Sequence, residues 1–292
     1  MHNISYGFIQ VVKLKNKFIL YAIPFLAAVI CAAGCTSVKP VTKSVRFALL
    51  GNTSPDSPFS GFNKSLNSVL AEIQNHKPQI IIHTGNAIYG GTEADGILET
   101  DIRRQLCIFF PMLKKLHTAA YTIPGDRDYY NNSSSIYCEF SGKPSSYSFN
   151  YGSIHFICLS PAETTTDLTS GIDMEWLKKD LEEFQDSSAI FIFTHQRLFQ
   201  EKKKRKTPEK NQELHDLFLK YGVKYVFSGE GKDFTTKLKD TVKYINTGCV
   251  VASDGKDNRK TNQFYIVNLI NNEIKIDPVN INTQGKFLKG KK

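Results

Sequence analysis

Five short polar clusters in the sequence combine residue types that hold ions or move protons. They are GNTS at residues 51–54, GNA at 85–87, GDRD at 125–128, TH at 194–195 and GEGK at 229–232. Carboxylates, amides and an imidazole are ligands for a hard or borderline divalent metal ion, whereas arginine and lysine bind anions. The clusters therefore predict a metal site, an anion site, or a site in which these side chains neutralise one another.

Each cluster follows an apolar run of the kind that forms a buried strand. The runs are RFALL, QIIIH, AAYTI, AIFIF and YVFS. Helical periodicity separates them at residues 65–78, 101–117 (interrupted at Pro111), 173–184 and 211–222, and further strands are expected at 243–253, 262–270 and 273–281. This alternation indicates an α/β protein with a second sheet packed on the first. Ligands bind at the carboxyl ends of strands in such sheets, so we expect the five clusters to converge.

The order, spacing and strand contexts of the clusters resemble the calcineurin-like metallophosphoesterase family over roughly residues 44–270. In that family the clusters read Asp-x-His, Gly-Asp, Gly-Asn-His-Asp/Glu, a single His and Gly-His-x-His, and they hold two divalent metals that share one aspartate. The resemblance implies an α/β four-layer sandwich of the metallophosphoesterase type, with two mixed β-sheets flanked by helices. It also implies hydrolase chemistry, in which the metals polarise a phosphoester and activate a bridging water.

The sequence departs from the family pattern where the metals would bind. In the first two clusters, Asn52 and Ser54 replace the family's Asp and His, and Asn86 replaces the bridging Asp. In the third, Asp126 replaces Asn and Arg127 replaces the catalytic His, whereas Asp128 matches. His195 matches in the fourth cluster, and Glu230 and Lys232 replace both histidines of the fifth. The first metal would meet neutral oxygens and the ammonium of Lys232. At about 4 Å and an effective dielectric of about 20, an ammonium and a divalent ion repel by roughly 8 kcal/mol. We therefore expect that metal to be absent.

One divalent ion is still conceivable at the second metal position. Asn86, Asp126, His195 and Glu230 would offer it an amide, two carboxylates and an imidazole, a donor set that suits Mn, Fe, Zn or Mg. Without the bridging carboxylate and the second ion, however, the two-metal clamp is lost. A phosphohydrolase that uses this single metal is the alternative hypothesis for the function.

Two further hypotheses concern Arg127 and Lys232. In the first, they pair with Asp126, Asp128 and Glu230, so that side-chain charges replace the lost ions. In the second, they bind a phosphate or phosphoester without hydrolysing it. Arginine at the position of the family's catalytic histidine cannot deliver and recover a proton near neutral pH. We therefore expect no catalytic residue and no cofactor, and we predict a module that binds a phosphate-containing ligand or an envelope protein.

The N-terminal residues 1–34 have the layout of a secretory signal peptide. Lys13, Lys15 and Lys17 precede an apolar run that ends in AAGC. This ending resembles a bacterial lipobox, with Ala where a large aliphatic residue is usual, and it implies cleavage before Cys35 and lipid on its thiol. A plain transmembrane anchor is the alternative. Both place the chain in the cell envelope, outside the cytoplasm (periplasmic or cell surface) and tethered to a membrane.

The rest of the chain divides into a polar tether at residues 35–45 and one domain at residues 46–292 with a basic tail. Removal of residues 1–34, which hold three lysines and no acidic residue, lowers the net charge from +9 to +6. Much of this excess lies in KKKRK at residues 202–206 and in the tail. No aromatic residues interleave with KKKRK, so we do not expect a nucleic-acid partner.

Cysteines and histidines outside the clusters have simpler interpretations. An exported protein can pair its cysteines, and three pairings are open for the four that follow the lipobox: Cys107, Cys138, Cys158 and Cys249. Three histidines are interpreted as core residues: His83, His117 and His155.

Overall fold

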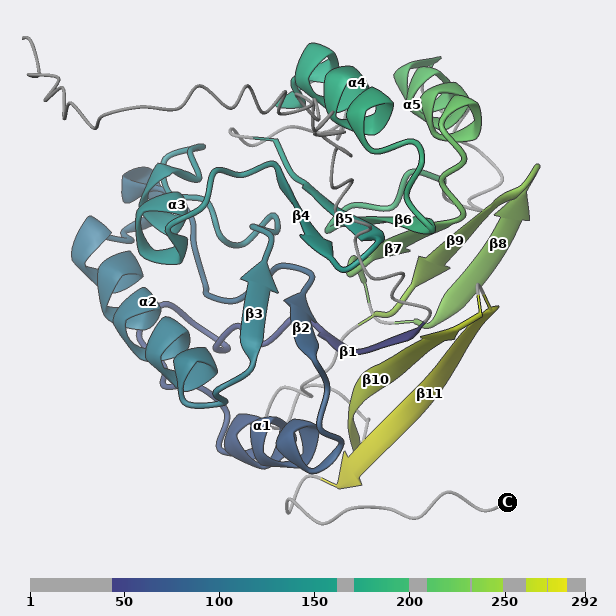
Figure 1. The fold of residues 1–292 in the computed structure, drawn as a ribbon. Helices are drawn as coiled ribbons and strands as arrows, with labels where there is room; N and C mark the ends of the chain where they lie inside the picture. Colours follow the sequence, from purple (N-terminus) through teal and green to yellow (C-terminus); the bar gives the residue numbers. More distant parts are fainter. Residues whose placement is uncertain are drawn as a thin grey trace, which may run out of the picture. The chain divides into compact units, whose positions relative to one another are not determined.

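The strands form two mixed sheets (Figure 1). A computed structural model describes residues 44–161, 171–199, 209–231, 233–248, 261–271 and 273–282. The first sheet has five strands in the order β11 (Glu273–Asn282), β10 (Thr261–Ile270), β1 (Ser44–Leu50), β2 (Ile80–His83) and β3 (Ala119–Thr122). Strands β1, β2 and β3 are parallel, and β10 and β11 continue the sheet in antiparallel pairs.

The second sheet has six strands and an antiparallel strand at each edge. Their order is β4 (Tyr147–Tyr151), β5 (Ile154–Leu159), β6 (Ala189–Thr194), β7 (Tyr225–Ser228), β9 (Val242–Asn246) and β8 (Thr235–Lys239). The four inner strands are parallel. Every residue of β5 and of β6 is buried, because each strand is covered on both faces.

Helices cover the outer faces of both sheets, as Figure 1 shows. The first sheet carries α1 (Ser65–Asn75), α2 (Glu99–Lys114) and α3 (Ser135–Ser141), with the short 3-10 helix η1 (Glu93–Asp95) before α2; the second carries α4 (Met174–Glu183) and α5 (Glu209–Lys220). The predicted four-layer sandwich of two mixed sheets and flanking helices is confirmed. Within the described ranges, no helix combines the length and hydrophobicity that a membrane span requires.

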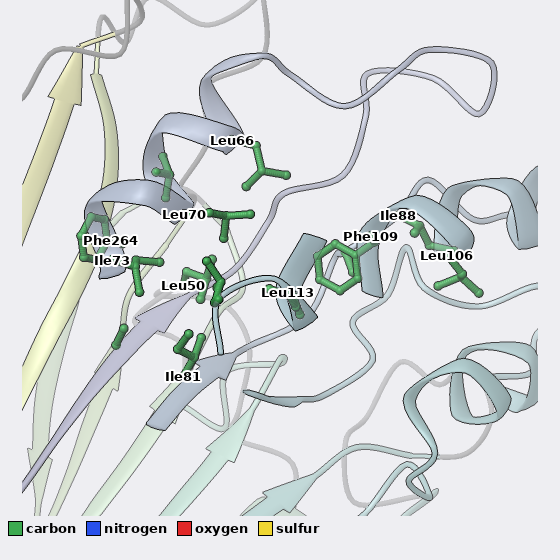
Figure 2. Close-up of a cluster of buried hydrophobic side chains, with 14 of the residues drawn as sticks. Leu50, Leu66, Leu70, Ile73, Ile81, Ile88, Leu106, Phe109, Leu113 and Phe264 are labelled. Carbon is green, nitrogen blue, oxygen red and sulfur yellow. The ribbon is translucent and has the colours of Figure 1, made fainter. Parts of the chain in front are cut away.

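The first helical layer packs through a continuous apolar core (Figure 2). Helix α1 buries one face because its apolar residues recur at helical spacing: Leu66, Val69, Leu70 and Ile73. This face meets Ile81 of β2 and Phe264 of β10. Burial of one such side chain contributes about 1.5–3 kcal/mol to stability. The helical layer is therefore stabilised by the sum of many small contributions.

A separate core lies between the two sheets and is centred on an aromatic cluster. The Phe47 ring of β1 meets the rings of Phe156, Phe191, Phe193 and Phe227 edge-on, with centroids 5.7–6.0 Å apart. Edge-to-face contacts at this separation are favourable beyond the area that they bury. The contact fixes β1 of the first sheet against three parallel strands of the second.

Two local predictions from the sequence are corrected by the structure. Helix α2 is not interrupted at Pro111 but runs on to Lys114. Pro111 lies in the last turn, where it removes one N–H donor, and Phe109 and Leu113 on either side remain buried. The strand predicted at residues 243–253 ends as β9 at Asn246, and Gly248 then adopts a left-handed conformation at φ 68°. Residues 249–253 lie outside the described ranges.

Candidate functional site

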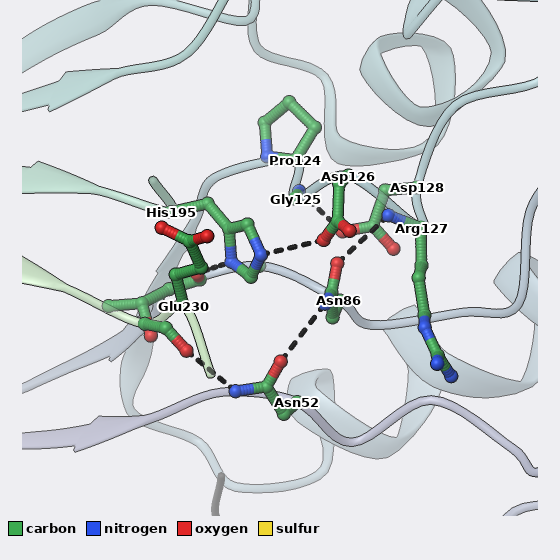
Figure 3. A network of polar contacts seen from close by, with 12 residues as sticks. Asn52, Asn86, Pro124, Gly125, Asp126, Arg127, Asp128, His195 and Glu230 are labelled. Atoms are coloured by element: carbon green, nitrogen blue, oxygen red, sulfur yellow. Dashed lines mark hydrogen bonds and ion pairs between the residues drawn. The ribbon is translucent and has the colours of Figure 1, made fainter. Parts of the chain in front are cut away.

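The five polar clusters meet where parallel strands of both sheets end. Figure 3 shows side chains from all five loops close together: Asn52, Asn86, Asp126, His195 and Glu230. Hydrogen bonds cross between the sheets at this place. Nδ1 of His195, after β6, donates to the carbonyl of Thr84, after β2, at 2.8 Å. Nδ2 of Asn52, after β1, donates to the carbonyl of Gly229, after β7, at 2.6 Å. The predicted convergence at the carboxyl edge is therefore observed.

Asn52 and Asn86 both have a left-handed backbone conformation, with φ of 52° and 57°. Asparagine tolerates this region better than most residues, because its short polar side chain bonds locally. Their amides bond in series: Nδ2 of Asn86 donates to Oδ1 of Asn52 at 3.0 Å, and Nδ2 of Asn52 donates to the carbonyls of Gly229 and Gly248. Oδ1 of Asn86 accepts the backbone N–H of Arg127 at 2.9 Å.

His195 is held by an acceptor at each ring nitrogen. Its Nδ1 lies 2.8 Å from the Thr84 carbonyl oxygen, and its Nε2 lies 2.8 Å from Oδ1 of Asp126. Because a carbonyl and a carboxylate both accept, this geometry favours an imidazole that carries a proton on each ring nitrogen. His195 is 3% exposed, so the ring lies inside the protein.

The pair of His195 and Asp126 shifts the titration of both groups. Burial alone would lower the pKa of His195, but the hydrogen bond and the charge of Asp126 raise it above its ordinary value. The hydrogen bond from His195 in turn lowers the pKa of Asp126 to about 2. The Asp126 side chain is 61% exposed, so water screens part of this attraction.

Asp128 is buried under the loop that follows β3, and it holds this loop in place instead of lining the site. It is 1% exposed, and its two carboxylate oxygens accept the backbone N–H groups of Ile88 and Gly125 at 2.9 and 2.8 Å. Burial raises the pKa of Asp128 to about 7. The residue therefore fastens the loop after β2 to the loop after β3. A further constraint is Gly125, where a Cβ atom would collide with Asn86.

Arg127 turns away from the acids of the site, as Figure 3 shows. Its guanidinium carbon lies 5.3 Å from the centre of the Tyr89 ring, a cation–π contact. Within the described ranges, no ion pair joins Arg127 to Asp126, Asp128 or Glu230, so the pairing expected for this residue is not found. The charge of Arg127 still contributes to lowering the pKa of Asp126, after the larger effect of His195.

Glu230 is engaged by Arg197, a residue that the sequence reasoning missed. Oε2 of Glu230 accepts the backbone N–H of Arg197 at 2.9 Å. In return, the guanidinium of Arg197 donates to the Glu230 carbonyl from Nε at 3.1 Å and from a terminal nitrogen at 2.8 Å. These bonds join the loops after β6 and β7. The sequence feature that could have indicated this contact is the position of Arg197, two residues after His195 in the same strand-end loop.

In this arrangement, donor atoms of the predicted single-metal set are engaged in hydrogen bonds within the protein. Nε2 of His195 bonds Asp126, the amide oxygen of Asn86 accepts from Arg127, and Glu230 accepts from Arg197. Among the described residues, no group of three or more His, Cys, Asp or Glu side chains is placed to hold a metal ion. The side chains of the site bond to one another and to backbone groups of the neighbouring loops.

Three histidines were interpreted as core residues, and two of these interpretations are correct. His83 is buried, its Nδ1 accepts the N–H of Gly85 at 3.3 Å, and its Nε2 lies 3.0 Å from Oγ1 of Thr53. Burial, and then the charge of His195, lower its pKa to about 3. His155 is also buried. His117 is exposed, so its interpretation as a core residue is wrong.

Several residues of the sequence prediction lie outside the described ranges. Lys232, half of the predicted anion site, and Cys35, the predicted lipidation site, are among them. Cys107, Cys138 and Cys158 are free thiols, so no disulfide joins any two of these three residues. Cys249 also lies outside the described ranges.

The sandwich of two mixed sheets between helices, with polar loops meeting at the strand ends, defines a protein of the metallophosphoesterase class. A model of the calcineurin-like phosphoesterase family matches residues 57–229. The chain belongs to this family. The matched segment includes Asn86, Asp126 and His195 but neither Asn52 nor Glu230. A search of curated protein sequences found no significant match.

Solved structures of the same fold come from distant proteins. A purple acid phosphatase from yellow lupin (Lupinus luteus) seeds aligns with a TM-score of 0.57 at 14% identity, over 84% of this chain and 52% of that one. A dimetal phosphatase from Danio rerio gives a TM-score of 0.57 at 12% identity, over 82% and 99%. GAP50, the anchor in the inner membrane complex of Plasmodium, gives 0.54 at 16% identity, over 82% and 85%. At these identities the likeness establishes the fold.

Proposed function

We propose that this chain is a membrane-anchored exported lipoprotein whose calcineurin-like phosphoesterase domain binds a ligand without turning it over. The observation that carries the proposal is the mutual engagement of the strand-end side chains. Asn86, His195 and Glu230 use their potential ligating atoms for hydrogen bonds within the site. A site satisfied in this way has no need of a metal ion to neutralise or organise it.

The residue types support the same proposal. By resemblance to the family, Asn52 and Asn86 stand where two metal-binding aspartates belong, and Arg127 stands where the catalytic histidine belongs. An amide is a weaker metal ligand than a carboxylate, and arginine does not exchange protons near neutral pH. The proposed domain therefore lacks both the ions and the acid–base group of the family's reaction.

A phosphate-containing anion is the proposed ligand. Arg127 is exposed at the tip of the loop after β3, and its guanidinium presents a fork that matches phosphate oxygens. Lys232, from the loop after β7, is the second proposed contact. We propose further that, when the anion binds, the Arg127 guanidinium either moves off the Tyr89 ring or donates to the anion from the N–H groups at its edge. An envelope protein is the alternative ligand, for which the domain would serve as a scaffold.

Metal analysis and ligand-induced thermal shifts test this function. The purified full-length protein is expected to hold no stoichiometric metal and to show no Mn²⁺-dependent turnover of phosphomonoesters or phosphodiesters. Inorganic phosphate should raise the melting temperature, since a ligand that binds only the folded state stabilises it by about 2.7 kcal/mol at 100 times its Kd. Arg127→Ala should remove most of this shift, whereas Arg103→Ala, on helix α2, should keep it.

Each contrary result overturns a different part of the proposal. Stoichiometric metal together with turnover that His195→Ala abolishes would establish the single-metal phosphohydrolase instead. One observation favours that second candidate: the bond from Nδ1 of His195 to the Thr84 carbonyl orients the ring as in many metal-binding histidines. Phosphate that leaves the melting temperature unchanged would reject the anion and favour the protein scaffold.

The membrane anchor is proposed from the signal-like residues 1–34 and from Cys35. We expect expression in a bacterial host to give a membrane-bound, lipid-modified protein whose mass exceeds that of the cleaved chain. Cys35→Ser should remove the lipid-derived mass and leave residues 1–34 attached, with Cys107→Ser as the matched control. A wild-type protein that keeps residues 1–34 and carries no lipid-derived mass would support an uncleaved transmembrane anchor instead.

A further inference from the structure

We infer that Asn52 and Asn86 form a metal-independent crosslink, which we call the amide bridge, and that it holds the strand-end loops of both sheets together. The inference concerns the architecture of the site and does not require that the site binds an anion. It follows from the poor fit of these residues to a metal: the same atoms that could approach an ion are linked into a chain of hydrogen bonds.

The amide bridge is continuous from one sheet to the other. It begins at the backbone N–H of Arg127, which donates to Oδ1 of Asn86 at 2.9 Å. Nδ2 of Asn86 then donates to Oδ1 of Asn52 at 3.0 Å. Nδ2 of Asn52 donates to the carbonyls of Gly229 at 2.6 Å and Gly248 at 3.2 Å. The bridge thus joins the loops after β3, β2 and β1 to the loops after β7 and β9, as the dashed lines in Figure 3 partly trace.

The donor-to-acceptor direction of the hydrogen bonds in the amide bridge requires an amide at both position 52 and position 86. Each of the two side chains accepts with its oxygen and donates with its nitrogen. A carboxylate has no donor, so an aspartate at position 52 would face the carbonyl oxygens of Gly229 and Gly248 with a negative charge. An aspartate at position 86 would keep the bond from Arg127 but lose the bond to Asn52.

The surroundings make these bonds important for stability. Asn86 is 8% exposed, and Asn52 is partly buried. A buried polar group that loses its partner carries the full cost of its desolvation. With aspartates at both positions, two carboxylates would lie about as close as the present amides, and their repulsion would require protonation or a cation. The asparagines therefore remove the requirement for a metal ion, and two single-atom changes should restore it.

Asn→Asp variants test the amide bridge because the exchange preserves shape. The melting temperature of the purified full-length protein should be the same with EDTA and with Mn²⁺. Asn52→Asp and Asn86→Asp should each lower it by about 5 °C or more in EDTA, given about 2–4 °C per kcal/mol for a domain of this size. The double variant should melt lower still in EDTA and recover several degrees in millimolar Mn²⁺, with bound metal detected by elemental analysis.

Asn132→Asp is the matched control. Asn132 also has a left-handed backbone, with φ of 65°, and it is exposed. Its exchange for aspartate should leave the melting temperature unchanged in both conditions. Asn52→Asp and Asn86→Asp variants that melt like Asn132→Asp would overturn the inference. A wild-type protein that loses stability in EDTA would overturn both this inference and the proposed absence of a metal.

Hydrogen exchange of the wild type gives a test that does not depend on variants that fold. In EDTA, the backbone amide of Arg127 should exchange slowly, although its acceptor is the Asn86 side chain and no backbone carbonyl. Exchange of this amide at the rate of an exposed loop would show that the bridge is not formed. Slow exchange of Arg127 with normal melting of both single variants would show a bridge that does not stabilise the fold, which also rejects the inference.

Discussion

At the scale of single residues, the site is defined by which group donates and which accepts. His195 uses both ring nitrogens as donors, whereas Asn52 and Asn86 each use one end of the amide for each role. Asp128 accepts on both oxygens and is buried beneath the loop. Both charged residues of this set, His195 and Asp128, therefore have hydrogen-bond partners.

The pair of Asp126 and His195 should stabilise the fold over a bounded range of pH. Because the pKa of Asp126 is lowered to about 2, its contribution is complete above the ordinary pKa of aspartate and is lost as the pH falls toward 2. Because the pKa of His195 is raised, its contribution is complete below 6.5 and is lost as the pH rises through the raised value. The stabilisation should therefore be greatest in mildly acidic solution.

Melting temperatures of wild type and Asp126→Asn, measured across this range, check the prediction. Asparagine can still accept from His195 but carries no charge, so the difference between the two proteins reports the ion pair. The difference should be largest at about pH 5, inside the window that these two shifts set. Asp56→Asn, at an exposed aspartate, is the control. A difference that stays constant with pH would contradict the assignment.

At the scale of elements, the sequence predicted the strands well because buried strands have long apolar runs. It placed the ends of β1, β2, β3, β6 and β7 closely enough to predict that their loops converge. It missed α3 and β8, which are short, and it mistook Pro111 for an interruption of α2. Short elements have little periodicity of their own, and their conformation is decided by the core they pack on.

The orientations of side chains at the strand ends could not be predicted in the same way. The sequence placed Arg127 and Glu230 in the right loops, but it showed neither their partners nor the role of Arg197. Arg127 lies against Tyr89, and Arg197 binds the Glu230 carbonyl. These choices depend on rotamers and on neighbours distant in sequence, which composition and spacing do not contain. The residue types were therefore predictable, and the hydrogen-bond network was not.

At the scale of the whole molecule, the contact between sheets positions the site. The loops after β1 to β3 belong to one sheet and those after β6 and β7 to the other, so they meet only if the sheets pack in register. Phe47 is fully buried at the centre of that contact, among Phe156, Phe191, Phe193 and Phe227. Its ring contacts four rings of the second sheet at once.

Phe47→Ala should therefore lower the free energy of unfolding by about 3–5 kcal/mol, the range for removing a buried phenylalanine. Denaturant unfolding of the two proteins gives this difference, and Phe47→Leu should lose clearly less. Leu238→Ala is the control, because Leu238 is 70% exposed and its loss should change stability little. Equal losses for Phe47→Ala and Leu238→Ala would show that the two sheets are held together elsewhere.

The amide bridge also makes the protein sensitive to slow chemical ageing of its asparagines. Spontaneous deamidation converts asparagine into a mixture of isoaspartate and aspartate. At Asn52 or Asn86 either product would lose the amide donor on which the bonds to Gly229, Gly248 and between the two asparagines depend. A sample stored warm at alkaline pH should therefore divide into two populations that melt at different temperatures. The fraction that becomes aspartate would have gained a carboxylate where the family carries one, so ageing would move part of the sample back toward the family's metal-binding pattern.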